Sequence, residues 1–148
     1  MSAHTILALF AAVLGGAAVA LQAPVNAALA SGLRSTIGAA AVSFGVGFAI
    51  LIVVLLVIGD GPAVGRLGGV KPWLLVGGAL GAFYVWTIVW TVPTLGILTA
   101  ISAVVLGQLA AALFLDAIGP FGLATIEITW QRVVGILMVA GGLLLSKL

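Results

Sequence analysis

Two amide side chains inside one apolar stretch are the residues of this sequence best suited to bind a polar ligand. Gln22 and Asn26 are four positions apart, so on a helix they share one face, and Pro24 lies between them. Proline has no amide N–H and disrupts the helical hydrogen bond to the carbonyl of Ala20, so we expect a kink that exposes this carbonyl. These groups could hold a polar ligand. Alternatively, the amides satisfy the loosened backbone or bond a neighbouring helix.

Further polar and aromatic side chains in apolar stretches extend this candidate site. Gln108 lies alone near the middle of its stretch and is open to the same two interpretations, since polar groups at membrane depth usually face a bundle interior or a cavity. Ser43 can instead bond its own helix backbone. Tyr84 and Trp86 could line a cavity with aromatic surface, or pack against other helices or lipid. The predicted substrate-binding residues are therefore Gln22, Asn26, Ser43, Tyr84, Trp86 and Gln108.

The acidic and basic side chains gather at the ends of the apolar stretches. Asp116 closes one stretch, and Arg132 lies at the start of the next, so we expect an Asp116–Arg132 ion pair with a structural role. No carboxylate lies near the middle of any apolar stretch. Proton-coupled export of organic cations generally relies on such a group, which holds the proton and the cation in turn. The sequence therefore disfavours that mechanism.

Enzymatic chemistry has little support in this sequence. His4 is the single histidine, cysteine is absent, and no acid lies at membrane depth. Neither a Ser–His pair nor a metal site can be assembled from these residues within a membrane. We therefore expect no enzyme activity, no metal and no cofactor.

The composition is that of a membrane protein. Of the 148 residues, 64% are hydrophobic and 5% are charged, and the mean hydropathy is +1.46. Soluble domains carry charge on about a quarter of their residues. The formal net charge of +2 comes from a handful of side chains and gives no reason to expect a nucleic-acid partner.

The apolar stretches predict an all-α, polytopic membrane protein in which one transmembrane domain covers residues 1–148. Each stretch approaches or exceeds the roughly 20 residues that span hydrocarbon. Ser35 or Thr36 is expected to cap the second helix, Pro72 to lie in the first turn of the third, and Pro93 to form a tight join before the fourth. The first stretch lacks a preceding basic segment, so we expect a helix of the mature fold there. The five expected helices are 5–30, 36–58, 73–90, 95–115 and 128–146.

An odd number of helices places the two termini on opposite sides of the membrane. Arg66, Lys71 and Arg132 then lie on the N-terminal side, and Arg34 and Lys147 lie on the other. Three against two is a weak bias under the positive-inside rule, so a modest preference for a cytoplasmic N-terminus and insertion in both orientations are both compatible with it.

Small residues at four-residue spacing let helices approach closely in lipid. One such row in the fourth helix could contribute to contact between two copies of the chain. It consists of Thr99, Ala103, Gly107 and Ala111.

Several short motifs occur in a fixed order along the chain: Gln22–Asn26, Ser43–Gly47, Gly77–Val85, Pro93–Gly96, Gly107–Leu109, Asp116 with Gly119 and Phe121-Gly122, and Arg132–Gly135. In this order they resemble the YdcZ-like family of the drug/metabolite transporter superfamily, which is related to the EamA-type carriers. The resemblance covers almost the whole chain. Ala117 departs from it, because a histidine is expected after the aspartate, and any proton handling there loses its support.

The resemblance implies a half-size carrier. Larger relatives contain ten helices in two five-helix repeats of inverted topology, with the substrate between them. This chain would supply one such half, and two copies inserted head to tail would restore the inverted repeat.

The sequence and the resemblance together favour a multi-pass inner-membrane transporter of a small metabolite or drug-like solute. We expect a homodimer that works by alternating access, with an antiparallel arrangement favoured over a parallel one. A passive channel for small solutes or ions and a non-transporting membrane scaffold are the alternatives. The expected partners are the lipid bilayer, a second copy of the chain and a small-molecule substrate.

Overall fold

The chain folds into helices arranged in two compact units. The computed structural model describes residues 2–146, and no strand occurs among them. The units are Met1–Pro93 and Thr94–Leu148. The all-helical fold expected from the sequence is therefore confirmed.

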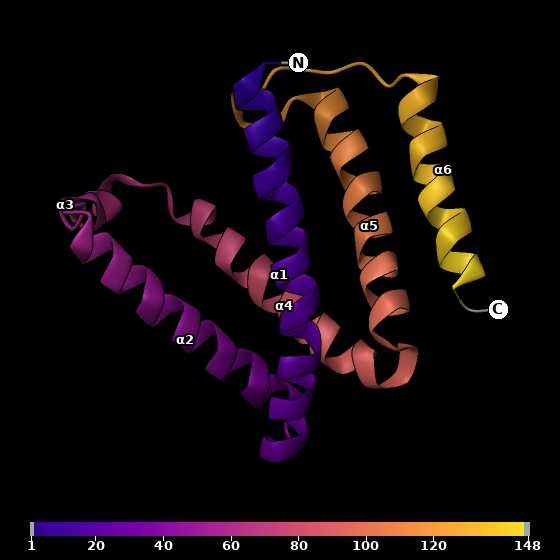
Figure 1. The fold of residues 1–148 in the computed structure, drawn as a ribbon. Coiled ribbons are helices and arrows are strands. Elements are labelled where there is room, and N and C mark those ends of the chain that lie inside the picture. Colours follow the sequence, from indigo (N-terminus) through magenta and orange to yellow (C-terminus); the bar gives the residue numbers. More distant parts are fainter. Residues whose placement is uncertain (1, 147–148) are drawn as a thin grey trace. The chain divides into compact units, whose positions relative to one another are not determined.

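The first unit contains three long helices and a connection built of short ones. Figure 1 shows α1 and α2 meeting at the turn that joins them, with α3 at the opposite end of α2. The long helices are α1 (Ala3–Leu33), α2 (Thr36–Val57) and α4 (Val76–Leu95), and the short ones are α3 (Pro62–Gly65), η1 (Arg66–Gly69) and η2 (Pro72–Leu75). Pro72 opens η2, at the start of the third apolar helix as expected.

A tight turn between α1 and α2 holds these two helices together. Arg34 adopts a left-handed conformation with φ of 51°, and its N–H bonds to the last carbonyls of α1. The Ser35 hydroxyl then accepts a hydrogen bond of 2.9 Å from the N–H of Gly38. Ser35 is thus the N-cap of α2, which satisfies one of the backbone donors at the helix start.

Small side chains form the core of the first unit. Ala30 of α1, Ala39 and Ala40 of α2, and Val85 and Val89 of α4 pack together as one buried cluster. Alanines at this meeting point let the backbones of α1 and α2 approach closely, as small residues do in lipid, and the side chains of Val85 and Val89 pack against them from α4. This cluster positions the polar side chains that lie farther along the same helices.

Both prolines expected to disturb helices lie inside them. α1 is a helix on both sides of Pro24, and the kink there stays a prediction. The expectation that Pro93 lies in the join to the next helix is wrong, because α4 continues to Leu95. The φ of proline fits a helix, and Pro93 lies in the last turn of α4, where few helical hydrogen bonds remain to be lost. The chain turns at Gly96, whose φ of 77° suits a residue without a side chain.

The second unit consists of two helices and the segment between them. α5 (Ile97–Ile118) packs along α6 (Trp130–Leu145), and η3 (Pro120–Gly122) begins the connection. At the far end of this pair, the Thr99 and Ser146 hydroxyl oxygens lie 3.3 Å apart. Lys147, which entered the charge count above, lies outside the described residues.

Four helical segments within residues 2–146 are long and apolar enough to cross a membrane. They are Ala3–Leu33, Thr36–Val57, Pro72–Leu95 and Ile97–Ile118. The fifth expected helix is shorter than predicted: Thr129 is extended, and α6 has 16 residues. At 1.5 Å per residue α6 is about 24 Å long, somewhat less than a typical hydrocarbon core of about 30 Å.

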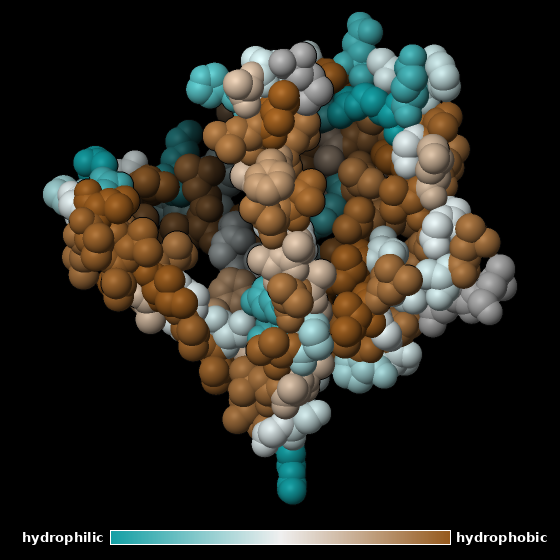
Figure 2. Space-filling view, viewed as in Figure 1, coloured by the Kyte–Doolittle hydropathy of each residue, from teal (hydrophilic) through white to brown (hydrophobic). Residues whose placement is uncertain are grey.

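The helix surfaces are apolar where a soluble protein would be polar. Figure 2 shows hydrophobic side chains along the visible length of α2, with hydrophilic ones gathered at its α3 end. Val57, Ile50 and Leu51 of α2 are all exposed. Such surfaces are suited to lipid, and they agree with a multi-pass membrane protein.

Gly119 at the end of α5 offers a test of this fold. Its φ is +56°, and a Cβ atom there would lie 2.6 Å from the carbonyl oxygen of Leu123. We expect Gly119→Ala to cost at least about 1–2 kcal/mol, since alanine disfavours this conformation and clashes with backbone. Thermal unfolding of the purified protein should show a melting temperature lower by about 4 °C or more. Gly141→Ala, in open space on α6, is the control, and equal melting temperatures for the two variants would contradict the described connection.

Candidate functional site

A hydrogen bond between two side chains joins α1 to α2 at a point several turns from the connection between the two helices. The Gln22 Nε2 atom donates to the Ser43 Oγ atom at 3.2 Å. Gln22 lies about 16 Å from the end of α1 at Leu33, and Ser43 lies about 10 Å from the start of α2, by the helical rise. Two of the residues predicted from the sequence are therefore brought into direct contact, well inside the apolar length of the first unit.

This pair opens onto a groove with aromatic walls. The groove has a volume of about 400 Å³ and combines the two polar side chains with an otherwise apolar lining. Phe44 and Phe48 stand one helical turn apart on α2, and Gly47 beside them leaves space, since nothing lies within 4 Å of a Cβ placed there. The groove is lined by Gln22, Ser43, Phe44, Gly47, Phe48, Leu51 and Val85.

Behind this groove lies a small cavity between α1 and α4. Gln22, Asn26 and Tyr84 contribute its polar lining, and its volume of about 10 Å³ is near the lower limit for holding a single water molecule. Asn26 is 4% exposed, whereas Gln22 is exposed and lines both the cavity and the groove. The two amides that flank Pro24 thus line the same small cavity as Tyr84, and all three are among the predicted substrate-binding residues.

Trp86 fixes α4 against the beginning of α2. Its indole Nε1–H donates to the Thr36 hydroxyl at 3.3 Å, and its ring stacks on Trp90 with centroids 5.9 Å apart. Trp86 also lines a second, apolar groove of about 310 Å³ together with Phe44 and Phe83. Phe44 is therefore shared by both grooves, and Trp86 lies beside the Gln22–Ser43 groove and not in it.

Gln108 does not belong to the same compact unit as these residues. It belongs to α5 of the second unit, and its side chain is exposed. The candidate site of the first unit consists of Gln22, Asn26, Ser43 and Tyr84. A role for Gln108 in binding stays a prediction.

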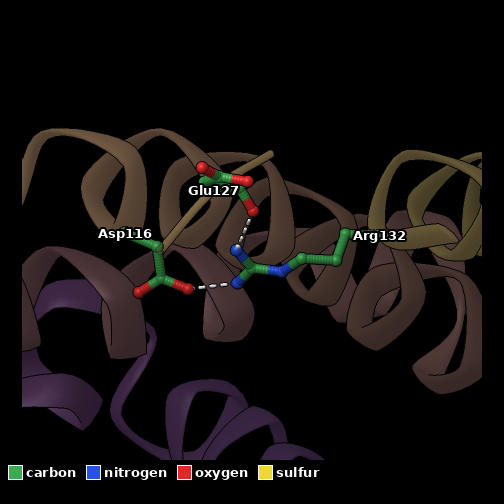
Figure 3. A network of polar contacts seen from close by, with 3 residues as sticks. All are labelled: Asp116, Glu127 and Arg132. Carbon is green, nitrogen blue, oxygen red and sulfur yellow. Dashed lines mark hydrogen bonds and ion pairs between the residues drawn. The ribbon is translucent and has the colours of Figure 1, made fainter. Parts of the chain in front are cut away.

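Two charged side chains of the second unit, Asp116 and Arg132, tie the end of α5 to the start of α6. Figure 3 shows the Arg132 guanidinium between Asp116 and the main chain of Glu127. Arg132 Nη2 donates to Asp116 Oδ2, and Nη1 lies 3.4 Å from the Glu127 carbonyl oxygen. The backbone adds a bond of 2.8 Å from the N–H of Ile126 to the Asp116 carbonyl. The expected ion pair is present, and its position favours a structural role.

The aromatic walls were missing from the sequence-based set of site residues. Phe44 directly follows Ser43, and Phe44 and Phe48 are four positions apart, so the two rings share one face of a helix. Their spacing does not differ from that of other apolar residues of α2, all of which are compatible with lipid contact. Only the position of α2 against α1 distinguishes them.

The groove is suited to hydrogen bonding without charge. A glutamine amide has two N–H donors and a carbonyl acceptor, and its bond to Ser43 uses one donor. The serine hydroxyl keeps its own proton to donate. The pair can therefore offer both a donor and an acceptor to a solute between aromatic walls.

Comparison with known families finds one family model that matches most of the chain. Residues 7–145 match the family model described as "Putative inner membrane exporter, YdcZ". A search of curated proteins finds no significant match. Nor does a search of solved structures.

The Asp116–Arg132 pair should contribute measurable stability. Both side chains are about one-third exposed, so we expect Asp116→Asn to cost up to about 1 kcal/mol. Asp60→Asn is the matched control, because Asp60 and Arg66 are 4.0 Å apart and mostly exposed. Melting temperatures of the two variants at low salt should fall clearly for Asp116→Asn and hardly for Asp60→Asn. The reverse order would contradict a structural role for the pair.

Proposed function

We propose a transport mechanism for this chain, which belongs to the YdcZ family: it carries a small metabolite or drug-like solute across the inner membrane by alternating access as a homodimer. Family membership and the apolar helices support a multi-pass inner-membrane transporter. The type of solute, the alternating-access mechanism and the homodimer go beyond what the family match supports, and they are proposed here.

The Gln22–Ser43 pair is the observation that carries the proposal. It is a polar pair on an open groove, roughly midway along helices that cross hydrocarbon. Lipid tails cannot satisfy the remaining donors and acceptors of these side chains, and polar groups at this depth commonly mark a substrate path. We therefore assign solute binding to this groove, with Asn26 and Tyr84 behind it.

Alternating access requires helices that can move against one another. Glycines at Gly15, Gly16 and Gly45 have no atoms within 4 Å of a Cβ position, so these stretches of α1 and α2 are not locked by tight packing. α1 and α2 are joined by the short Arg34–Ser35 turn. Movement of one helix about this turn would open or close the groove that they share.

An antiparallel homodimer would complete the carrier. In this arrangement α6 is the fifth span of each copy, and a modest thinning of the bilayer accommodates its 16 residues. Ten helices would then surround a two-fold axis in the membrane plane, as in inverted-repeat transporters. Thr99 is buried and lies against Ser146, so the exposed Gly107 and Ala111 are the part of the small-residue row that suits a partner helix.

Counterflow in proteoliposomes tests the carrier mechanism. Solutes that stabilise the purified protein in a screen of a metabolite library would be loaded unlabelled into vesicles, and the labelled form added outside. A carrier should accumulate label transiently above the equilibrium level. A channel would equilibrate without overshoot, a scaffold would give the same uptake as protein-free vesicles, and either result would contradict the proposal. Ser43→Ala should slow exchange about fivefold, as loss of one neutral hydrogen bond allows, whereas Thr87→Val should not.

Single-cysteine labelling tests the antiparallel arrangement. The chain contains no native cysteine, so Gly68→Cys in the connection before α4 and Ser31→Cys at the end of α1 each report one side. An impermeant maleimide applied to intact cells should label about half of each variant, since the charge bias is weak. Complete labelling of one variant with none of the other would indicate a single orientation and a parallel dimer.

A further inference from the structure

We infer that the groove between α1 and α2 selects a neutral solute that combines a flat aromatic body with an amide or hydroxyl group, and that it discriminates against organic cations and anions. This inference rests on the proposed transport function and names the substrate class for the same site. It follows from the charge, the hydrogen-bonding capacity and the shape of the groove.

The groove contains no charge to match a charged solute. Its lining consists of two neutral polar side chains and apolar ones. The Asp, Lys and Arg side chains of the first unit are Arg34, Asp60, Arg66 and Lys71, all in the connections, and His4 lies in the first turn of α1, far from the groove. Moving an ion from water to such a site is unfavourable unless a counter-ion is present. A cation over Phe44 or Phe48 would regain only part of that free energy.

The polar pair matches a group that both donates and accepts. Gln22 retains an N–H donor and a carbonyl acceptor beyond its bond to Ser43, and the Ser43 hydroxyl can donate its proton. A primary amide offers the complementary set in one plane. A hydroxyl group satisfies part of it, whereas an alkyl chain satisfies none.

The walls favour a flat apolar body. Phe44 and Phe48 present two rings to the groove, and the missing side chain at Gly47 leaves the space between them open. Aromatic rings prefer offset-stacked or edge-to-face neighbours, which a planar solute provides. A volume of about 400 Å³ lies at the lower end of the range for small-molecule sites, so the solute is small.

A lipid acyl chain is a poor alternative occupant. It would fill the apolar part of the groove but leave the polar groups of Gln22 and Ser43 without additional partners in a medium that supplies none. The polar pair is also the feature that distinguishes this groove from the neighbouring one beside Trp86, whose lining is apolar apart from the indole. We therefore assign the solute to the first groove.

Three probes with one aromatic body and different charges test this inference. Indole-3-acetamide is neutral, tryptamine is a cation at pH 7, and indole-3-acetate is an anion. Calorimetric titration of the full chain in nanodiscs should show indole-3-acetamide binding at least tenfold more tightly than either ion. Equal or tighter binding of tryptamine or indole-3-acetate would overturn the inference, as would the absence of saturable binding by all three.

Two variants link the selectivity to the groove. Ser43→Ala should weaken indole-3-acetamide binding by three- to tenfold, and Thr87→Val should leave it unchanged, because the Thr87 hydroxyl bonds to the Phe83 carbonyl of its own helix. Gln22→Glu should reverse the preference and make tryptamine the tighter probe. If Ser43→Ala folds poorly, Gln22→Glu decides alone, and an unchanged preference contradicts the site.

The two proposals can fail separately. Counterflow of a charged solute found in the library screen would overturn the neutral substrate class and leave the carrier mechanism standing. Conversely, selective binding of indole-3-acetamide without counterflow by any screened solute would support the site and contradict the carrier.

Discussion

Hydrocarbon offers no hydrogen-bond partners, and this constraint organises the polar groups of the chain. Thr87 and Thr91 donate their hydroxyl protons to carbonyls one turn earlier in α4. The indole N–H of Trp86 donates to the Thr36 hydroxyl at the start of α2. The charged residues are confined to the ends and connections, where Arg132 pairs with Asp116. Each polar group inside a span therefore requires either a local partner or a specific function.

In the Gln22–Ser43 pair, some hydrogen-bond donors and acceptors have no partner within the pair. Its two side chains satisfy one another once, yet both keep further donors or acceptors beside an open groove. The pair would cost free energy against lipid, whereas a polar solute or a wetted path removes that cost. The alanine-rich core formed by Ala30, Ala39 and Ala40 holds the three helices at the separation that this groove needs. Packing and binding thus depend on the same helix contacts.

Hydropathy and cap residues predicted the all-helical fold and the start of α2, because both are local properties. The helix starting at Thr36 and its Ser35 cap agree with the structure. The errors came where local signals compete: Pro93 suggested a join, although its φ fits a helix and Gly96 makes the turn. The contact of Gln22 with Ser43 could not be predicted, since it depends on how α1 crosses α2. The same holds for Phe44, whose place in two grooves depends on the position of α4.

Access of water-soluble reagents to position 43 tests the central claim that the polar pair lines a solute path. In this cysteine-free chain, the Ser43→Cys variant can be treated in membranes with an impermeant thiosulfonate reagent. Val46→Cys is the reference, since it lies at nearly the same depth of α2 but outside the lining of the groove. We expect the thiol of Ser43→Cys to react at least tenfold faster than the thiol of Val46→Cys, and indole-3-acetamide to protect the faster one. Equally slow reaction of both variants would mean that lipid covers the pair and would contradict the account.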